Sequence, residues 1–450
     1  NSIAPFLFWT KQKGHRPFCY NEFTTKALKR GKTMSHNDCT RRSLGITDNN
    51  IIFDDANSNH YEYIKGNKCL VYDGYLNYRV DRCPNCGFEN DLVKNGVKRC
   101  LTYIPSNNGW IIYLRLTKQR WLCHRCRSSF SCHTSCVSPN RSISVNTRKM
   151  VLKYAKRDLS MTEIGRLTNI SPTSVSRIIK ETVGEHRYRF QDQLPENLCI
   201  DEFRSVQQAM SFIVLDADSH KLVELLSDRR LATIKDYFLS YSLENRLRVR
   251  TVTMDLNANY QNIIHMIFPK AKIIIDRFHI VQMLGRNIDR ERLNTLTQIE
   301  DKRSRTYRIL KSQWRIYKKS ADKLITNERI YRIHNREFLT DYEILDIGLS
   351  CSTRFKATWE TYQALLTAIH TQDFVSFKRT IDDYIPLKTD LDVTINTIKL
   401  NLKHIENSIN YKYSNGPIEG TIRKIKQIKR TGYGYRNMLS LFTRIRLEFA

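Results

Sequence analysis

Between positions 197 and 280, apolar residues come in short runs, and several of these runs end in an acidic residue. The runs alternate with segments whose apolar residues recur every three or four positions, the spacing of an amphipathic helix. We expect three strands, a helix, a strand, a helix and a strand, an order typical of an α/β fold. Three of the strands are predicted to end at Asp201, Asp255 and Asp276, in the sequences ENLCID, RVRTVTMD and KAKIIID.

A second helical pattern lies upstream, where apolar residues mark two helices joined by a short turn. The first carries Ile164 and Leu167, Ile170 anchors the turn, and the second carries Val175, Ile178 and Ile179. Ser171 is expected to cap the second helix, with Pro172 as its first residue. This pattern predicts a helix-turn-helix; the alternative is an ordinary helical hairpin inside a core. In a DNA-binding motif, the second helix would present to the major groove Thr173, Ser174, Ser176, Arg177 and Lys180.

The segment from residue 286 to residue 400 is strongly helical in pattern and rich in charge. We interpret it as a helical insertion that interrupts the α/β domain and packs against DNA or a second protomer. Its Trp314 and Trp359 are expected to be core residues.

The net charge of the chain narrows the class of molecules that it is expected to bind. Lys and Arg number 74 against 45 Asp and Glu, a net charge of +29, and the isoelectric point is near 9.7. This excess favours a polyanion, and DNA is the leading choice. A solvated basic surface or an anionic membrane face is the alternative. Because no run of 18 apolar residues occurs, we expect a soluble cytoplasmic protein that does not enter membranes.

Four of the twelve cysteines form two CxxC pairs, CPNC and CHRC. Two such knuckles on tight turns can place four thiolates around one tetrahedral zinc ion. We therefore predict a zinc ribbon with a structural role, and the alternative is a set of free or redox-active thiols. Cys132 and His133 are competing ligands. The expected zinc ligands are Cys83, Cys86, Cys123 and Cys126.

The acids at the strand ends suit a hard divalent cation, because magnesium takes oxygen ligands and pairs with phosphate oxygens. Asp201 and Asp255 are the first candidates, and Asp276 is the reserve. Glu202 should point to the opposite face of the sheet from Asp201, since successive strand residues alternate.

A lone acid, Glu419, opens a basic helix near the C-terminus, in the sequence SNGPIEGTIRKIKQIKR. It is either a third metal ligand or the partner of Arg423 in an i,i+4 ion pair, and the residues alone leave both open. The cations expected to hold a DNA backbone here are Arg423, Lys424, Lys426, Lys429 and Arg430.

The segments CIDEF, TMDL, DRFH and SNGPIEGTIRKIKQIKRTGYGYRN resemble the catalytic blocks of DDE transposases of bacterial insertion sequences, in the ISL-three family. The resemblance implies a ribonuclease-H-like fold, magnesium or manganese at the site, and recognition of terminal inverted repeats. It implies DNA cleavage and strand transfer in transposition and recombination, a homo-oligomer in the synaptic complex, and association with the bacterial nucleoid. By this likeness Asp201, Asp255 and Glu419 match the catalytic triad, while Asp276 and His279 support it from behind.

The expected architecture is thus a multidomain α/β protein in which a zinc ribbon and a helix-turn-helix precede a ribonuclease-H-like domain interrupted by a mostly helical insertion. The alternatives to a transposase are a non-enzymatic DNA-binding regulator with a degenerate catalytic domain and a nuclease without strand transfer. The predicted segments are an upstream or non-native extension (1–33), an N-terminal segment (34–78), the ribbon (79–140), the helix-turn-helix (141–190), the catalytic core (191–285), the insertion (286–400) and the C-terminal part of the core (401–450).

Overall fold

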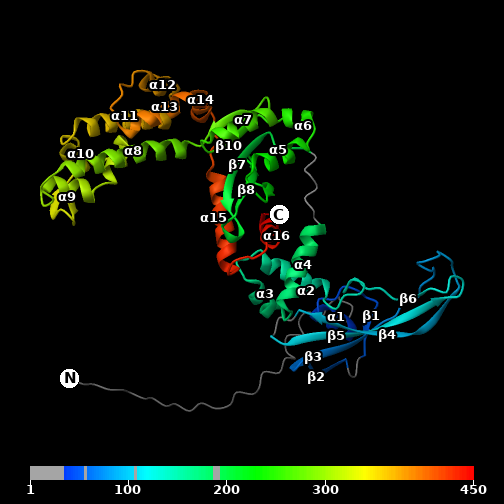
Figure 1. Ribbon diagram of the computed structural model, residues 1–450. Coiled ribbons are helices and arrows are strands. Elements are labelled where there is room, and N and C mark those ends of the chain that lie inside the picture. Colours follow the sequence, from blue (N-terminus) through cyan, green and yellow to red (C-terminus); the bar gives the residue numbers. More distant parts are fainter. Residues whose placement is uncertain (1–34, 55–57, 106–108, 186–192, 450) are drawn as a thin grey trace, which may run out of the picture. The chain divides into compact units, whose positions relative to one another are not determined.

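Figure 1 shows the computed structural model, which describes residues 35–54, 58–105, 109–185 and 193–449. The predicted extension, residues 1–33, lies outside the described residues. The chain divides into two compact units, Asn1–Met150 and Val151–Ala450, and each has its own core.

The first unit is built on a six-stranded sheet of order β1-β3-β5-β4, with β2 paired to β3 and β6 to β5. Strands β3 and β5 run parallel, and the other pairs are antiparallel. Alternate residues of β5, Ile112, Leu114 and Leu116, enter the core. The elements are α1 (His36–Ser43), β1 (Ile51–Phe53), β2 (Asn59–Ile64), β3 (Asn67–Leu76), β4 (Leu92–Ile104), β5 (Ile111–Cys123) and β6 (Ser129–Ser131).

The pairing of β3 with β5 joins two segments that the sequence analysis separated. Strand β3 belongs to the predicted N-terminal segment 34–78, and β5 belongs to the predicted ribbon 79–140. Both therefore contribute to one sheet and one hydrophobic core.

Three helices follow: α2 (Val145–Ala155), α3 (Met161–Thr168) and α4 (Pro172–Glu185). The predicted start of the last helix is confirmed, because Pro172 is its first residue and the Ser171 hydroxyl accepts from the amide of Ser174 at 3.2 Å. The apolar residues expected on these helices are buried except two. Ile170 is half-buried, and Leu167 is 44% exposed.

The second unit contains a five-stranded sheet of order β11-β10-β7-β8-β9, in which β11, β10 and β7 are parallel and β8 and β9 antiparallel. The predicted order of strands and helices is confirmed, with one added short helix, α6. Strand β7 does not end at Asp201 as predicted but continues to Arg204. The elements are β7 (Asn197–Arg204), β8 (Met210–Asp216), β9 (Leu222–Leu226), α5 (Leu231–Leu239), α6 (Leu243–Leu247), β10 (Thr251–Met254), α7 (Ala258–Ile267) and β11 (Lys272–Ile275), with a 3₁₀ turn at Val206–Gln208.

The two faces of this sheet are buried under different elements. Along β7, Leu198 and Ile200 join the large core that includes residues of α5 and α7. Cys199 and Phe203, which point the other way, pack with apolar residues of α15 (Gly416–Thr431) and α16 (Met438–Phe449). The alternation of β7 therefore decides which helices each of its side chains meets.

A mostly helical segment leaves the sheet directly after β11 and returns at α14 (Figure 1). Its first helix begins at Arg277, before the predicted start at residue 286. Trp359 packs against the core as expected, whereas Trp314 is 37% exposed between Arg315 and Lys318, so its prediction was wrong. The elements are α8 (Arg277–Gln298), α9 (Arg305–Ser312), 3₁₀ turns at Ile316–Lys318 and Ala321–Lys323, β12 (Ile330–Arg332), β13 (Glu337–Leu339), α10 (Asp341–Leu349), α11 (Thr353–His370), α12 (Phe374–Asp382), α13 (Asp390–Leu400) and α14 (Leu402–Asn410).

Among the described residues, none of the helices combines the length and the apolar character needed to cross a membrane.

The close crossing of α3 and α4 depends on a glycine. A Cβ at Gly165 would lie 2.7 Å from the carbonyl oxygen of Ile170, which is backbone and cannot rotate away. We expect Gly165→Ala to lower the free energy of unfolding by about 1–3 kcal/mol, measured by urea denaturation. Gly184→Ala is the matched control, since its Cβ would meet nothing within 4 Å and should be neutral or stabilising by up to about 1 kcal/mol. Equal effects of the two changes would contradict this account.

Candidate active site

Two aspartates lie side by side where β7 and β10 pair in parallel. The register places Thr253 opposite Cys199, so Asp255 and Asp201, each two residues further on, fall on the same face of the sheet. Asp201 lies within β7, and Asp255 follows the last residue of β10. The parallel pair thus brings together two carboxyl groups that are 54 positions apart in sequence.

Burial and like charge together act on Asp201. Burial, and next the charge of Asp255, raise the pKa of Asp201 from its usual 3.8 to about 7. The amide of Glu202 donates to Asp201 Oδ1 at 2.6 Å and opposes the shift. A crowded pair of carboxyl groups of this kind fits a divalent cation, which would relieve their repulsion.

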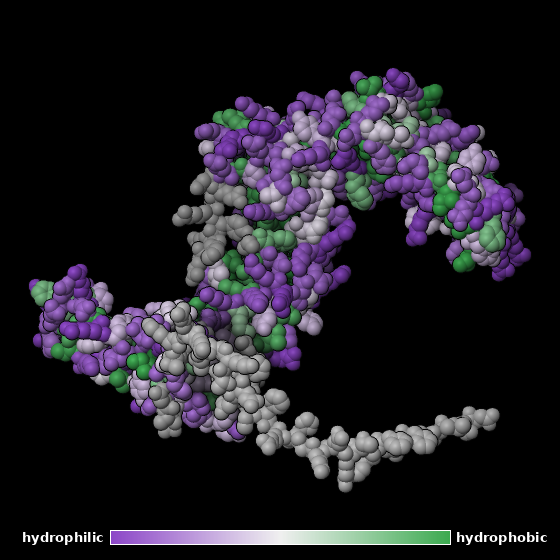
Figure 2. Space-filling view, turned by 180° about the vertical axis from the view of Figure 1, so that it is seen from behind, coloured by the Kyte–Doolittle hydropathy of each residue, from purple (hydrophilic) through white to green (hydrophobic). Residues whose placement is uncertain are grey.

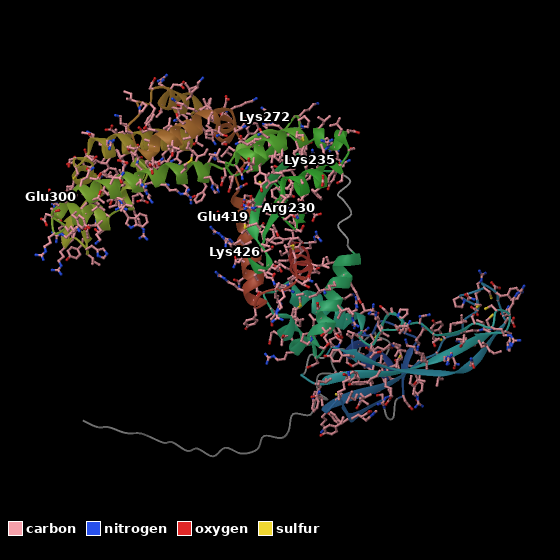
Figure 3. The ribbon with its side chains drawn as sticks, in the orientation of Figure 1. Arg230, Lys235, Lys272, Glu300, Glu419 and Lys426 are labelled. Atoms are coloured by element: carbon pink, nitrogen blue, oxygen red, sulfur yellow. The ribbon has the colours of Figure 1, made fainter. Side chains whose placement is uncertain are left out.

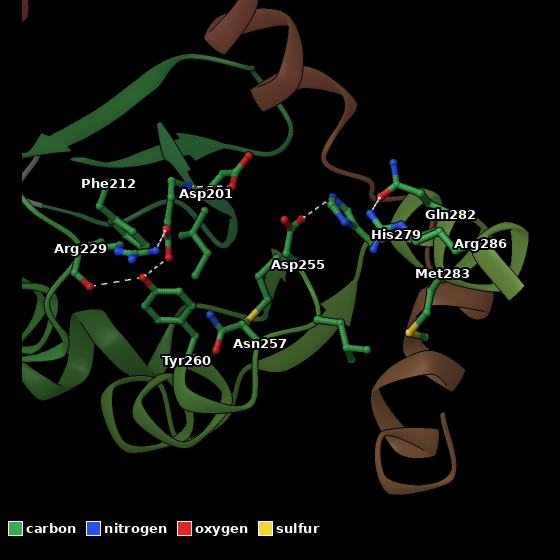
Figure 4. A pocket seen from close by; sticks show the side chains of 14 residues that line it. Asp201, Phe212, Arg229, Asp255, Asn257, Tyr260, His279, Gln282, Met283 and Arg286 are labelled. Atoms are coloured by element: carbon green, nitrogen blue, oxygen red, sulfur yellow. Dashed lines mark hydrogen bonds and ion pairs between the residues drawn. The ribbon is translucent and has the colours of Figure 1, made fainter. Parts of the chain in front are cut away.

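Asp255 is held by two neighbours from distant elements. His279 Nε2, on the first turn of α8, lies 2.9 Å from Asp255 Oδ1. The side-chain nitrogen Nδ2 of Asn415 donates to the same oxygen at 3.2 Å. The hydrogen bond to Asp255 raises the pKa of His279. Figure 4 shows the His279 ring turned toward Asp255.

Asp276 is buried behind this pair and caps α8. Its Oδ1 accepts from the amides of Phe278 at 3.5 Å and Asn415 at 3.4 Å, and burial raises its pKa. Asp255, Asp276 and His279 each offer a ligand atom within 4.8 Å of the others, so they could hold a metal ion. The sequence analysis placed Asp276 and His279 as supports of the site, and the structure brings both to Asp255.

Asn415 is the residue that the sequence analysis missed. It is 4% exposed, precedes α15, and contacts both Asp255 and Asp276. Its side-chain oxygen is buried with no hydrogen-bond partner among the described residues. In the sequence, the feature that could have pointed to Asn415 is its position just before a helix that begins with Gly-Pro.

Glu202 points away from Asp201, as expected. It accepts from Tyr260 Oη and pairs with Arg229, both at 2.6 Å, on the opposite face of the sheet. A pocket of about 640 Å³ is lined both by Asp201 and Asp255 and by Glu202, Tyr260 and Arg229. Arg286 also lines it. Glu419 is not among its lining residues.

Glu419 lies on the first turn of α15, with its side chain 55% exposed (Figure 3). Its carboxylate pairs with Arg423 at 2.7 Å, which is the ion-pair alternative of the sequence analysis. The structure groups neither Glu419 nor Asp201 with Asp255, Asp276 and His279 as ligands within 4.8 Å of one another. The preceding Ile418 nevertheless packs against the same face of the sheet that carries Asp201, through Cys199 and Phe203.

Two half-buried cations of α15 that are predicted to contact DNA bind to groups of the protein itself. Lys424 pairs with Asp158 and Glu448 at 3.2 and 3.3 Å, and Lys429 donates to the carbonyl oxygens of Arg204 and Ser205 at 2.8 and 2.7 Å. The other predicted contacts differ in accessibility. Exposed are Thr173, Arg177, Lys180, Arg423, Lys426 and Arg430, while Ser174 and Ser176 are half-buried.

In the first unit, the four CxxC cysteines converge. Cys83 Sγ lies 3.6 Å from Cys126 Sγ, and Cys86 Sγ lies 3.7 Å from Cys123 Sγ, with all four within 4.8 Å of one another. These distances are too long for disulfides. Thiolates ~2.3 Å from one tetrahedral zinc would lie about 3.8 Å apart, so the cluster fits that metal.

Comparison with known proteins gives the chain a family. The model of the ISL-three family of DDE proteins, described as "Transposase", matches residues 198–445. This chain belongs to that transposase family. Its match includes Asp201, Asp255, Asp276, His279 and Glu419.

Two curated relatives are also similar to this transposase. The "Transposase for insertion sequence element IS1001" of Bordetella parapertussis is 23% identical over 386 residues, 75% of this chain and 91% of that protein. A Lactococcus lactis subsp. lactis protein named "ATP-dependent protease" is 32% identical over 121 residues, 27% of this chain and 39% of that protein. The chain therefore spans well under two thirds of the second relative.

The raised pKa of Asp201 makes the stability of the transposase depend on pH. Because the carboxyl is harder to ionise in the folded chain, ionisation destabilises the fold as pH rises from about 4 through about 7. In buffer without added divalent cations, we expect Asp201→Asn to raise the free energy of unfolding at pH 8 by roughly 2–4 kcal/mol, and hardly at all near pH 4.

Urea denaturation at several pH values measures this difference. The exposed Asp236, on α5, provides the control, since Asp236→Asn should show no such trend. A gain from Asp201→Asn that is the same at every pH would contradict the interpretation.

Proposed function

We propose that this chain binds the terminal inverted repeats of an insertion sequence and catalyses divalent-metal-dependent DNA cleavage and strand transfer. The observation that carries the proposal is the pair Asp201 and Asp255, adjacent on parallel strands within the region that matches the transposase family. The strand order β11-β10-β7-β8-β9 supports a ribonuclease-H-like core. A regulator with a degenerate catalytic domain is not favoured, because both aspartates are present and line one pocket together with His279.

Asp201, Asp255 and Glu419 are the proposed ligands of magnesium or manganese. When bound, such ions supply activation of water or of a 3′-hydroxyl and stabilise the oxygen that leaves phosphorus. His279 and Asn415 hold the Asp255 carboxylate in place, and Asp276 fixes the start of α8 that carries His279. Asp276 remains the reserve ligand.

Glu419 must leave Arg423 to join the aspartates. An exposed i,i+4 pair contributes only about 0.3–0.5 kcal/mol, so it offers little resistance to this change. We propose that this change is a rotation of the Glu419 side chain, since the preceding Ile418 packs on the face of the sheet that carries Asp201. Arg423 is then free for a DNA phosphate.

The proposed DNA contacts lie on exposed helical surfaces. Arg177 and Lys180 of α4 suit the major groove, with Thr173 beside them, and Lys426 and Arg430 of α15 suit the backbone. Hydrophilic residues, acids as well as cations, dominate the face seen in Figure 2. The synaptic complex is proposed to be a homo-oligomer that acts on the bacterial nucleoid in the cytoplasm.

The triad is tested one acid at a time. We expect Asp201→Asn, Asp255→Asn and Glu419→Gln each to reduce magnesium-dependent cleavage of a labelled element end by a factor of about 10³ or more, since each removes a ligand. End binding in a gel shift should change little. Asp236→Asn, the same chemical change on an exposed helix, should cleave normally.

Cleavage retained in one triad variant would remove that residue from the triad. Loss of end binding together with cleavage would instead indicate a folding defect. A strand-joining assay on the same samples separates a transposase from a nuclease, which cuts but does not join.

Zinc is proposed to hold the first unit together through Cys83, Cys86, Cys123 and Cys126. We expect one zinc per chain in the purified protein, measured by elemental analysis, and its loss in Cys83→Ser and Cys126→Ser. Cys39→Ser changes an exposed thiol on α1 and should keep the zinc. Full zinc content in the Cys83 and Cys126 variants would exclude this site.

A further inference from the structure

We propose that the catalytic unit binds DNA at a second surface, at the end of the five-stranded sheet opposite to Asp201 and Asp255. Two hollows of about 870 and 740 Å³ meet there and share Lys270, Lys272, Asn410 and Tyr411. We call them together the basic groove. Its charged lining residues are the cations Arg248, Arg250, Lys270, Lys272, Lys403 and Lys412 and the acids Glu196 and Glu406. The choice of DNA as the polyanion rests on the proposed function.

The fold builds the groove from three separate segments. Arg248 and Arg250 lead into β10, Lys270 and Lys272 lead into β11, and Lys403 lies on α14. Helix α14 packs on the outer strand β11, where the Asn407 amide donates to the Ile273 carbonyl at 2.9 Å. Since Asp255 and Asp276 follow the other ends of these two strands, the groove and the candidate active site lie at opposite ends of the sheet.

Most of the positive charge in the groove is not neutralised. All six cations are exposed, and only Arg250 has a carboxylate partner among the described residues, Glu196 at 3.1 Å. Lys272 donates to the Tyr411 hydroxyl at 2.8 Å, which leaves its charge intact. Figure 3 shows Lys272 at this end of the unit and Glu419 on α15, away from it.

The pocket at the other end of the sheet has no such excess of positive charge. Three acids, Asp201, Glu202 and Asp255, line it with Arg229, Arg286 and His279. A phosphate backbone is attracted more strongly to the groove, where six cations face two acids. The two ends therefore suit different stretches of nucleic acid.

The lining chemistry favours a phosphate backbone over a small ligand. Pockets for small molecules are mostly apolar with a few polar groups, but this groove is formed largely by long charged side chains from several segments. Cations spread along an open groove match a row of phosphates, which gives affinity without reading sequence.

The groove also borders the segment that reaches the catalytic acids. Tyr411 and Lys412 line it, and Asn415, three residues further on, contacts Asp255 and Asp276. Two DNA segments could supply the backbone: the element DNA inside its end, or the target duplex. Both present the same phosphates, so binding experiments must distinguish them.

The test uses the full chain with Asp201→Asn, so that binding is measured without cleavage. We compare the groove variant Lys270→Ala/Lys272→Ala/Lys403→Ala with a control that loses the same charge on exposed residues elsewhere, Lys356→Ala/Lys378→Ala/Lys399→Ala. Fluorescence anisotropy over a range of salt concentration gives the slope of log K against log salt. The slope is negative, and each lost phosphate contact makes it less steep by about 0.9. For the groove variant we therefore expect a slope that is less steep by up to about 2.7.

Two duplexes identify the source of the DNA. One carries the terminal inverted repeat with the adjoining element sequence, and the other is an unrelated duplex that serves as target. If the slope becomes less steep only with the duplex that carries the terminal repeat, the groove binds element DNA. If it becomes less steep with both duplexes, the groove binds any DNA backbone, including that of the target. The corresponding Lys→Arg variant should restore the original slope.

Unchanged slopes with both duplexes would overturn the proposal, and so would an equal fall in the control variant, because the groove would then contact phosphates no better than exposed lysines of the helical segment. Thermal melting confirms that each variant is folded. Because none of these readouts needs cleavage, failure of the groove proposal is distinct from failure of the proposed catalytic function.

Discussion

The parallel pairing of β7 with β10 is the constraint on which the site depends. Its register sets Asp201 and Asp255 on one face and fixes the distance between their backbones. Burial of Asp201, and next its repulsion by Asp255, raise the pKa of Asp201. The fold thus holds two carboxyl groups in an unfavourable arrangement, which the proposed divalent ions would relieve.

The elements around the pair act as its support. His279 comes from a helix that begins where β11 ends, and Asn415 comes from the start of α15, so three separate segments meet at Asp255 and Asp276. This convergence explains why the mostly helical segment can leave and re-enter the unit without disturbing the acids: both of its ends are tied to them.

Local patterns in the sequence predicted what depends on local spacing. The start of α4 at Pro172 and the convergence of the cysteine knuckles, as at Cys83, follow from short motifs, whereas the end of β7 was misplaced by three residues. Contacts between distant residues could not be predicted in this way. Lys429 looked like a DNA contact on a basic helix, yet it bonds to carbonyl oxygens more than two hundred positions earlier. The same holds for Asn415, and for β3, whose partner strand lies beyond the first cysteine knuckle.

The attachment of α15 limits how its acid can move. Asn415 fastens the start of the helix to two aspartates, and Lys429 fastens its last turns to the end of β7. Sliding or turning the helix would break both attachments at once. Only rotation about its own side-chain bonds is therefore left to move the Glu419 carboxylate. The helix itself stays anchored at both ends.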